Sequence, residues 1–326
     1  METLVLNYED VNNVFSTTDC LVAVEEAFKS LGEGKAENPV AIWHKMSGDQ
    51  PMIGLLVGTE EKKNILAVKS LAVNWDNPKK RQMHHTQGII MLCDAVSGFP
   101  LALIEGIIIS YARTGADAAV AAKYLARNDF RNVGVMGARD MARYFLRCMH
   151  VLFPKIEKVL VYSKTPANTA KYASDMNRLL GLDVQPFSTP QEVVKGSEVI
   201  MTGTRSTEPL IQNEWVNPGT HISWMGVKTE LDYNILNRSI VVSTIRDQSK
   251  IAEAISKKEI TPQVYTDIGE IVTGKKPGRT SPDQTTVYDG QGSGILDAVV
   301  SQLVFEAAKR SNLGKWVDLH KGAPAW

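Results

Sequence analysis

Residues 131–164 have the pattern of a nucleotide-binding strand–turn–helix–strand unit. An apolar run from Asn132 to Met136 ends at Gly137, apolar residues then recur at helical spacing as far as Met149, and a second apolar run follows. The first turn of such a unit directs backbone N–H groups and a helix N-terminus towards a phosphate. The stretch is therefore predicted to bind a dinucleotide.

The glycine pattern of this turn is incomplete. The fingerprint G-x-G-x-x-G/A is met by Gly137 and Ala142, but Arg139 stands at the second glycine position. One interpretation is that the Arg139 guanidinium folds over the diphosphate and pairs with it. The other is that the turn has lost its ligand and persists only as part of the fold.

The end of the next predicted strand favours a retained dinucleotide. Ser163, Lys164 and Thr165 stand where such a unit usually offers an Asp or Glu to the ribose hydroxyls. A cation with two hydroxyls suits a 2′-phosphate instead. NADP(H) is therefore expected as the preferred cofactor, with NAD(H) as the second choice.

The composition is that of an ordinary globular chain long enough for two domains. Its 326 residues are 44% hydrophobic and 22% charged, which allows a sizeable core. The 36 basic and 36 acidic side chains leave no net charge, so nothing in the charge balance favours nucleic acid or an anionic membrane as partner. Small polar ligands are expected.

The cysteines and the N-terminus indicate a reducing compartment. Cys20, Cys93 and Cys148 are odd in number, far apart and without a C-x-x-C spacing, so neither a disulfide framework nor a metal site is predicted. The first residues lack a basic signal segment, and the longest apolar runs are too short to span a bilayer. A cytoplasmic location without membrane contact is expected.

The segments before the nucleotide unit predict an α+β domain. A short strand at residues 4–6 precedes an amphipathic helix with N-cap candidates from Ser16 to Asp19. Apolar runs between residues 39 and 106 are separated by turn residues, which predicts an antiparallel sheet. A polar, basic loop at residues 75–85, WDNPKKRQMHH, interrupts these strands and is expected to collect binding groups.

The second half of the chain repeats the strand–helix pattern after a small-residue helix at residues 109–127. This alternation predicts a Rossmann-type doubly wound parallel sheet. Residues 265–294 are interpreted as a glycine-rich return, and residues 295–309 as an amphipathic helix. The predicted fold is therefore α/β, with a dinucleotide-binding domain at 115–295 inserted into an α+β domain, with an antiparallel sheet, at 1–114 and 296–326.

The order of these motifs resembles the ornithine cyclodeaminase and mu-crystallin family along nearly the whole chain. The residues that carry the resemblance are Lys69, Gly88, Arg113, Thr114, VYSKTP at 161–166, NPGTHISWMG at 217–226 and IGEIVTGKKPGR at 268–279. Within the family, WDNPKKR at 75–81 is most similar to the siderophore-pathway branch that oxidatively cleaves an aminocarboxyethyl-glutamate.

The resemblance implies a homodimer, with the α+β domain serving both dimerisation and substrate binding. Members bind NAD or NADP and pass hydride to or from an α-amino or α-imino acid. By position, Lys69 and Arg113 would hold the substrate carboxylate, and Lys45 approximates a further cation. The expected cofactor-binding residues are Thr114, Gly137, Ala138, Arg139, Asp140, Met141, Ser163, Lys164, Thr165, Thr204, Met225 and Gly226.

Several of these residues also have plain structural interpretations. A lone lysine in a strand, such as Lys69, is usually a solvated edge residue, and Arg113 could be a structural ion-pair partner. His84 and His85 could act as acid and base, with His85 binding substrate, or could be exposed loop imidazoles. The KKPGR run at 275–279 is interpreted as a solvated loop, and His44, His150 and His221 receive no role.

Three positions depart from the family pattern: Arg139, the Leu56–Val57 pair in place of Met-Pro, and Lys228 where members carry an aspartate. That aspartate would face the substrate amine and handle its protons, which an ammonium cannot do electrostatically. The chain is therefore not expected to be a standard ornithine cyclodeaminase. Because Lys228 would repel a diamine and attract an anion, a substrate with an acidic or neutral distal group is expected.

Two classes of function are compatible with the sequence. The first is a nicotinamide-dependent imine reductase or amino-acid dehydrogenase, in a specialised-metabolite or siderophore pathway, with Lys69, Arg113 and Lys228 as the catalytic candidates. The alternative is a non-catalytic protein of the mu-crystallin type that holds nucleotide or another ligand without turnover. The enzyme is preferred, because hydride transfer needs only cofactor, orientation and a proton relay that Lys228 or a histidine could supply.

Overall fold

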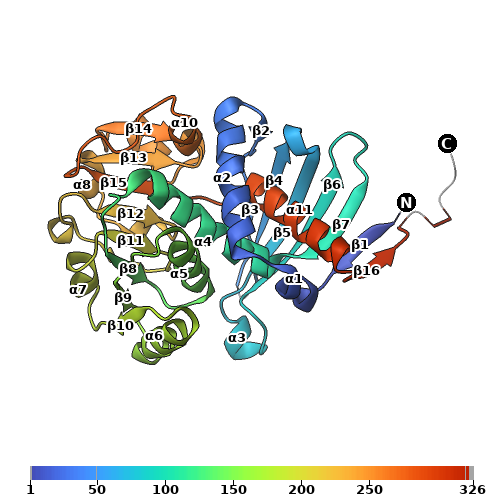
Figure 1. Ribbon diagram of the computed structural model, residues 1–326, viewed down its shortest axis with the longest axis horizontal. Coiled ribbons are helices and arrows are strands. Elements are labelled where there is room, and N and C mark those ends of the chain that lie inside the picture. Colours follow the sequence, from blue (N-terminus) through green and yellow to red (C-terminus); the bar gives the residue numbers. More distant parts are fainter. Residues whose placement is uncertain (1, 49, 320, 323–326) are drawn as a thin grey trace. The chain divides into compact units, whose positions relative to one another are not determined.

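The computed structural model describes residues 2–48, 50–319 and 321–322, and its chain divides into two compact units (Figure 1). Unit 1 comprises Met1–Arg113 and Gly292–Trp326, and unit 2 comprises Thr114–Gln291. The chain leaves unit 1 within helix α4 (Gly106–Leu125) and returns to it after strand β15 (Thr285–Asp289).

The core of unit 2 is a parallel sheet, with eight strands among the described residues, in the order β10-β9-β8-β11-β12-β15-β13-β14. The order reverses between β8 and β11, which makes this pair the switch point of a doubly wound sheet. The predicted Rossmann-type fold is thereby confirmed. The remaining bounds are β8 (Asn132–Met136), β9 (Lys158–Tyr162), β10 (Asp183–Pro186), β11 (Val199–Thr202), β12 (His221–Trp224), β13 (Ser239–Ser243) and β14 (Val264–Asp267).

The helices of unit 2 begin and end where local sequence directs. Thr189 and Glu192 form a reciprocal capping box at α7, and Gly181 adopts φ 68° to end α6. Helix α5 buries one face, from Ala142 to Met149, as its spacing predicts. The bounds are α5 (Asp140–Leu152), α6 (Pro166–Leu180), α7 (Pro190–Lys195), α8 (Asn234–Asn237), α9 (Ala252–Ser256), α10 (Ile268–Val272), η2 (Asn213–Trp215), η3 (Lys228–Glu230) and η4 (Arg246–Gln248).

The interpretation of residues 265–294 as a glycine-rich return is wrong. They contain the end of β14, all of α10 and the central strand β15, which pairs with both β12 and β13. The polar residues of β15 made it look like a loop in the sequence. It is a buried strand, and its threonine hydroxyls form hydrogen bonds within the protein. The Thr286 hydroxyl donates to the Leu125 carbonyl at 2.9 Å, and Thr285 accepts from Arg238 at 3.0 Å.

The KKPGR run is likewise not a simple solvated loop. Arg279 is half-buried, and its guanidinium donates to the carbonyls of Leu125 at 2.9 Å and Pro282 at 3.1 Å, to the Gln284 carbonyl, and to the Thr286 hydroxyl at 3.2 Å. Arg279 thus fastens the loop before β15 to the end of α4.

Unit 1 is built on a second sheet with the order β16-β1-β7-β6-β5-β4-β2, and β3 pairs with β4. Strands β4 to β7 form an antiparallel meander, and β1 joins β7 in parallel. The predicted antiparallel sheet is confirmed, within a mixed sheet. The strands are β1 (Thr3–Leu6), β2 (Ala36–Glu37), β3 (Ile42–Lys45), β4 (Met52–Glu60), β5 (Ile65–Val73), β6 (Thr86–Asp94), β7 (Pro100–Glu105) and β16 (Lys315–Val317).

Helices cover one face of this sheet. Helix α11 (Gly294–Arg310) packs against β4 and β5 and beside α2 (Thr17–Glu33), which Ser16 caps as predicted (Figure 1). Shorter helices are α1 (Tyr8–Val14), α3 (Asn77–Lys80) and η1 (Glu61–Lys63). Within the described ranges, no helix combines the length and apolar character needed to cross a bilayer.

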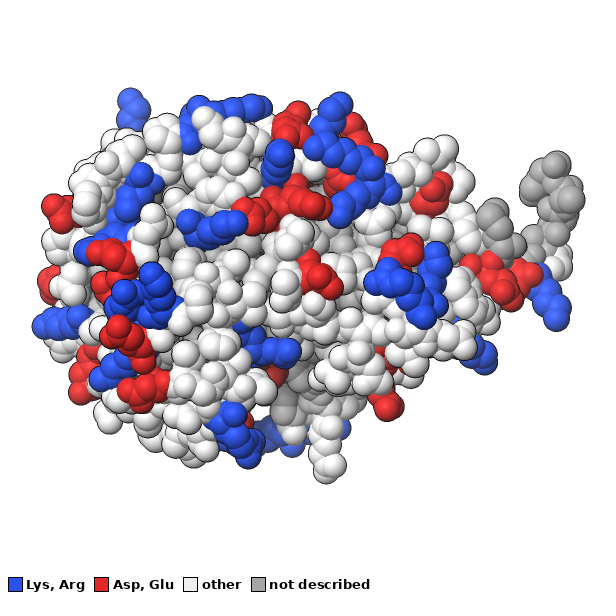
Figure 2. Space-filling model, in the orientation of Figure 1, with Lys and Arg blue, Asp and Glu red and all other residues white. Residues whose placement is uncertain are grey.

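The opposite face of the unit 1 sheet is apolar and only partly covered. Leu55 and Ile89 on this face are 40% and 54% exposed, and Val57, Val68 and Met91 are half-buried. Charged side chains elsewhere are mixed in sign over the face of the molecule that Figure 2 shows. The uncovered face is therefore an apolar surface that unit 1 presents.

The start of α11 lies directly on β4 through two glycines. A Cβ added to Gly58 would lie 2.1 Å from the Ile295 nitrogen, and one added to Gly294 would lie 2.0 Å from the Val57 oxygen. Asn38 accepts from the Ile295 N–H at 3.1 Å and from the Ser293 hydroxyl at 3.4 Å. Glycine at these positions therefore allows the first turn of α11 to approach the sheet.

Replacing Gly58 by alanine is expected to destabilise unit 1, because the methyl group would collide with main-chain atoms that cannot rotate away. The loss of unfolding free energy should be about 2 kcal/mol or more. Denaturant unfolding followed by circular dichroism measures it. Gly88→Ala on β6, where the nearest atom is 3.3 Å from the added carbon, is the control and should cost clearly less. Equal losses in the two variants would contradict the close-approach argument.

Candidate active site

Two cations of unit 1 share one buried carboxylate. The Lys69 ammonium lies 2.6 Å from Asp297 Oδ2, and Arg113 Nε donates to Asp297 Oδ1 at 3.0 Å. Lys69 also donates to the Ser110 hydroxyl at 3.3 Å. All three charged residues are at most 5% exposed. The structure thus brings together two of the predicted catalytic residues, Lys69 and Arg113, on a carboxylate that sequence reasoning missed.

Three elements position this cluster. Strand alternation places Lys69 on the face of β5 that α11 covers, together with Ala67. Ser110 and Arg113 are three residues apart on α4 and so lie on one side of that helix. Asp297 lies in the first turn of α11, where a carboxylate is favoured by the helix dipole.

The cluster retains one net positive charge. One carboxylate neutralises one of the two cations, and Arg113 Nη1 is buried with no hydrogen-bond partner among the described residues. Burial lowers the pKa of Lys69 to about 8; Asp297 opposes this shift and Arg113 adds to it. A buried donor without a partner beside excess positive charge is the chemistry that suits a second anion.

The burial and ion pairs of Lys69 and Arg113 bear on their plain structural interpretations. Lys69 is 1% exposed, which excludes a solvated edge lysine. Arg113 does make a structural ion pair, with Asp297. Lys45 is not part of the cluster, because it is exposed on β3, at the far end of the neighbouring strands. Its partner on β4 is Met52, and Met52 in turn pairs with Val73, which is four residues after Lys69 on β5.

The interpretation of His85 as an exposed loop imidazole is wrong. His85 is 6% exposed, stacks on Trp75 with ring centroids 4.6 Å apart, and its Nε2 lies 3.1 Å from the Tyr111 hydroxyl. Tyr111 also donates to the Thr86 hydroxyl at 3.1 Å. Tyr111 follows Ser110 on α4, so the helix that carries Arg113 also holds this histidine.

The turn after β8 has the geometry of a dinucleotide site. Gly137 adopts φ 109°, and an added Cβ would lie 3.3 Å from Thr204 Cγ2 and 3.4 Å from the Gly203 oxygen. Ala138 precedes the N-cap of α5, and Asp140 and Met141 are the first residues of that helix. The N-cap, Arg139, is exposed and makes no side-chain capping bond. The backbone and the helix N-terminus therefore fit a diphosphate, and the Arg139 guanidinium lies free of the cap.

After β9, the Ser163 side chain is hydrogen-bonded within the protein, whereas the Lys164 side chain is exposed. The Ser163 hydroxyl lies 2.7 Å from Thr169 Oγ1 and 3.1 Å from the Thr165 carbonyl, so it is engaged in the first turn of α6. Lys164 is exposed and lies at the carboxyl end of β9. Lys164 is thus the charged group that this turn presents.

A buried glutamate connects the turns after β11 and β12. Glu230 accepts from the Thr204 N–H and packs against Gly226, where an added Cβ would lie 2.1 Å from its Oε2. Burial raises the pKa of Glu230. Met225 donates its N–H to the Thr202 carbonyl at 2.8 Å. These two turns, which Glu230 connects, contain three of the expected cofactor residues: Thr204, Met225 and Gly226. A fourth, Thr114, is the first residue of unit 2.

Lys228 is exposed in η3, within unit 2, and is not among the residues of the buried cation cluster. Leu56 is buried on β4 beside Lys69 in the β4–β5 register. Over the ranges that the structure describes, no group of three or more His, Cys, Asp or Glu side chains is arranged to hold a metal ion.

The pH dependence of stability should report the burial of Lys69. The unfolded chain holds this proton up to about pH 10.5 and the folded chain only to about pH 8, so between these values the unfolded state binds more protons and rising pH stabilises the fold. Relative to Lys69→Met, wild type should gain about 3 kcal/mol of unfolding free energy from pH 8 to 10.5. Denaturant unfolding at several pH values tests this. Parallel pH profiles for the two proteins would contradict it.

Comparison with known proteins places the chain in a family of oxidoreductases. Residues 1–312 match the model of the ornithine cyclodeaminase/mu-crystallin family. An alanine dehydrogenase of Archaeoglobus fulgidus is 32% identical over 98% of this chain and 100% of its own. An N-((2S)-2-amino-2-carboxyethyl)-L-glutamate dehydrogenase of Staphylococcus aureus is 26% identical over 78% of each chain. The branch expected from the loop at 75–81 is thus one of several among the relatives.

Solved structures agree along the whole fold. Δ(1)-Pyrroline-2-carboxylate reductase of Thermococcus litoralis, in complex with NADH and L-proline, has a TM-score of 0.91 and 30% identity, covering 97% of this chain and 100% of its own. An archaeal alanine dehydrogenase dimer with bound NAD has a TM-score of 0.90 and 29% identity, covering 98% and 100%. These relatives bind NAD(H). The chain belongs to the ornithine cyclodeaminase/mu-crystallin family.

Proposed function

We propose that the protein is a nicotinamide-dependent oxidoreductase that interconverts an α-imino acid and an α-amino acid. The observation that carries the proposal is the buried cluster of Lys69, Asp297 and Arg113, with its surplus positive charge and its unpartnered Arg113 Nη1. A substrate carboxylate is the anion that such a cluster selects. Relatives named as dehydrogenases and reductases of such acids support this assignment.

The cluster would act by orientation. Arg113 Nη1 and the Lys69 ammonium bind the substrate carboxylate, and Asp297 holds both cations in fixed geometry. A carboxylate fixed at one end sets the direction of the neighbouring Cα–N bond, which lowers the entropic cost of hydride transfer. In unit 2, the turns that carry Gly137, Thr204 and Gly226 would hold the dinucleotide, which supplies or accepts the hydride.

The reaction is balanced by one proton. Reduction of the imino acid takes a hydride at Cα and a proton at nitrogen, and yields the amino acid and the oxidised dinucleotide. We assign proton exchange to His85, whose Nε2 lies 3.1 Å from the Tyr111 hydroxyl, or to Lys228, the candidates that the sequence singled out. An imidazole can both donate and accept a proton through its ring nitrogens, which suits His85 to this role.

The substrate is proposed to carry an acidic or neutral distal group. Lys228 is exposed in the turn after β12, where members of the family are expected to carry an aspartate. Two ammonium groups about 4 Å apart repel by roughly 4 kcal/mol at an effective dielectric near 20, which disfavours ornithine. Dicarboxylic imines, condensed keto-acid imines and cyclic imino acids are the classes that remain.

We also propose that the molecule is a homodimer through unit 1. The uncovered face of its sheet carries aliphatic side chains such as Leu55 and Ile89. A second copy of the same face would cover it symmetrically. The archaeal relative solved as a dimer supports the dimeric state. An interface through this face would make unit 1 the dimerisation and substrate domain.

Lys164 is proposed to select NADP(H) over NAD(H), because it is the exposed cation at the carboxyl end of β9 and the position lacks a carboxylate. Wild type should bind NADPH at least about tenfold more tightly than NADH, since a charged contact to phosphate contributes roughly 1.5 kcal/mol or more. Lys164→Asp should reverse the preference. Fluorescence titration of both cofactors measures it, with Lys171→Asp on α6 as control. Equal affinities in wild type would remove the argument.

Turnover should depend on Arg113 far more than folding does. Wild type is expected to consume NADPH or NADH with a cyclic imine, a dicarboxylic imine or a keto acid with ammonia, and to form no proline from ornithine. Arg113→Met should lower kcat/KM on the order of 100-fold, because it removes a buried charged contact to the substrate. The absorbance of reduced nicotinamide follows the reaction.

Arg310→Met, an exposed arginine on α11, is the matched control and should leave kcat/KM unchanged. Dinucleotide binding without turnover on any member of the panel would favour the non-catalytic, mu-crystallin-type function. Normal turnover by Arg113→Met would show that the carboxylate site is assigned wrongly.

A further inference from the structure

Lys250 makes an unusually complete set of contacts at the carboxyl edge of the unit 2 sheet. Its ammonium donates to Asp289 Oδ1 at 2.6 Å, to the Gly290 carbonyl at 2.7 Å and to the Trp224 carbonyl at 2.9 Å. It also lies 4.7 Å from the centroid of the Trp224 ring. All three ammonium protons therefore have an acceptor, and two of these acceptors are main-chain carbonyls.

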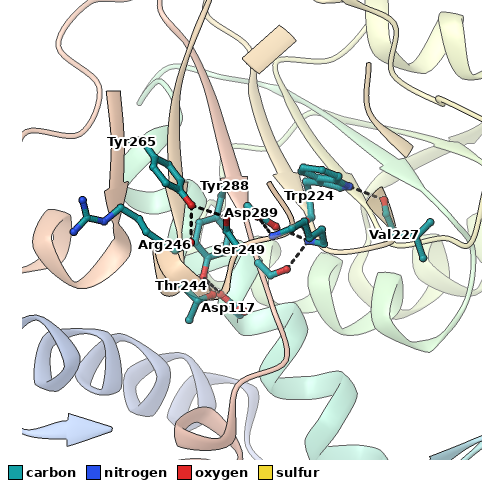
Figure 3. Close-up of polar contacts among 11 residues, drawn as sticks. Asp117, Trp224, Val227, Thr244, Arg246, Ser249, Tyr265, Tyr288 and Asp289 are labelled. Carbon is teal, nitrogen blue, oxygen red and sulfur yellow. Dashed lines mark hydrogen bonds and ion pairs between the residues drawn. The ribbon is translucent and has the colours of Figure 1, made fainter. Parts of the chain in front are cut away.

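The Lys250 contacts connect three neighbouring strands. Lys250 follows β13 and η4, its own N–H donates to Asp289 Oδ2 at 2.9 Å, and Asp289 is completely buried at the end of β15. Trp224 is the last residue of β12. Figure 3 shows the polar contacts around Trp224, Asp289 and Ser249. One lysine thus fixes the ends of β12 and β15 to the segment that leaves β13.

The segment that Lys250 fixes is the turn Trp224–Val227. The Trp224 indole N–H donates to the Val227 carbonyl at 2.9 Å, and Met225 packs against Gly290, where an added Cβ would lie 2.3 Å from its sulfur. Gly226 and Met225 are expected cofactor residues within this turn. The turn is therefore fixed at its start by Lys250, along its length by Gly290 and at its end by the Trp224 side chain.

The position of this turn in the sheet indicates which part of a dinucleotide it serves. Gly137 and Lys164 follow β8 and β9 on one side of the switch point, and Trp224–Val227 follows β12 on the other side. In a doubly wound sheet the two mononucleotide halves of the cofactor bind on opposite sides of that point. With the adenosine half at β8 and β9, the nicotinamide half falls to β11 and β12.

We infer that Lys250 is a positioning residue for the nicotinamide half of the dinucleotide, acting as an internal cation that holds the turn Trp224–Val227. The inference rests on the proposed function. A role in stability alone explains the contacts less well, because a buried ion pair contributes little net stability compared with apolar residues of the same volume. Apolar residues, however, could not hold the carbonyls of Trp224 and Gly290 in place.

The test compares the whole cofactor with a fragment that lacks nicotinamide. NADPH and 2′-phospho-ADP-ribose are titrated against wild type and against Lys250→Met/Asp289→Asn, a double variant that avoids leaving a buried, unpaired carboxylate. The double variant should bind NADPH at least about tenfold more weakly and the fragment as wild type does. Lys257→Met, which removes an exposed ion pair to Glu253, is the matched control and should change neither affinity.

Equal weakening of both ligands, or of neither, would overturn the inference and leave the proposed function intact. Failure of wild type to bind NADPH, NADH and the fragment would overturn the proposed function itself. Thermal unfolding of each variant establishes that it is folded at the temperature of the titration.

Chemical rescue gives a second readout that a general loss of stability would not produce. In Lys250→Ala, propylammonium can occupy the space of the deleted side chain and restore its charge. We expect it to recover NADPH affinity, whereas propanol, which has the same chain without the charge, should not. Recovery by both compounds, or by neither in a folded variant, would contradict a cation that holds the turn.

Discussion

The carboxylate of Asp297 is the constraint on which unit 1 depends. A lysine and an arginine as deeply buried as Lys69 and Arg113 need an opposite charge nearby, and Asp297 pairs with both, which leaves one positive charge in the cluster. The requirement fixes α4 and α11 on the covered face of the sheet. It also explains the glycines at 58 and 294, which allow the start of α11 to lie directly on β4.

The same physical device recurs in unit 2. Asp289 and Glu230 are fully buried carboxyl groups, and each accepts a hydrogen bond from a segment that follows a parallel strand: Asp289 from Lys250, and Glu230 Oε1 from the Thr204 N–H. Both fasten turns in which cofactor residues were expected. In each unit a buried carboxyl group therefore lies beside the proposed binding groups, where rigidity is most useful.

The fold was largely predictable from the sequence, and the site only in part. Hydrophobic periodicity, together with the cap at Ser16, identified most elements. Asp297 was missed because it lies 184 residues from Arg113 and is a single charge in the first turn of an amphipathic helix, where a charge usually marks the solvent face. Strand β15 was missed because its threonines are satisfied by partners distant in sequence. Lys69 was predicted as a site residue only from its position in the family pattern. Without that pattern, a lone lysine in a strand would have been placed in solvent.

Proton uptake on binding of a carboxylate tests the central claim most directly. At pH 8, Lys69 is about half protonated, and an anion that binds beside it should draw in up to about half a proton. Titration calorimetry with pyruvate in two buffers of different ionisation enthalpy measures this uptake. The account predicts uptake in wild type and none in Lys69→Met. Binding without proton uptake, or the same uptake in both proteins, would contradict it.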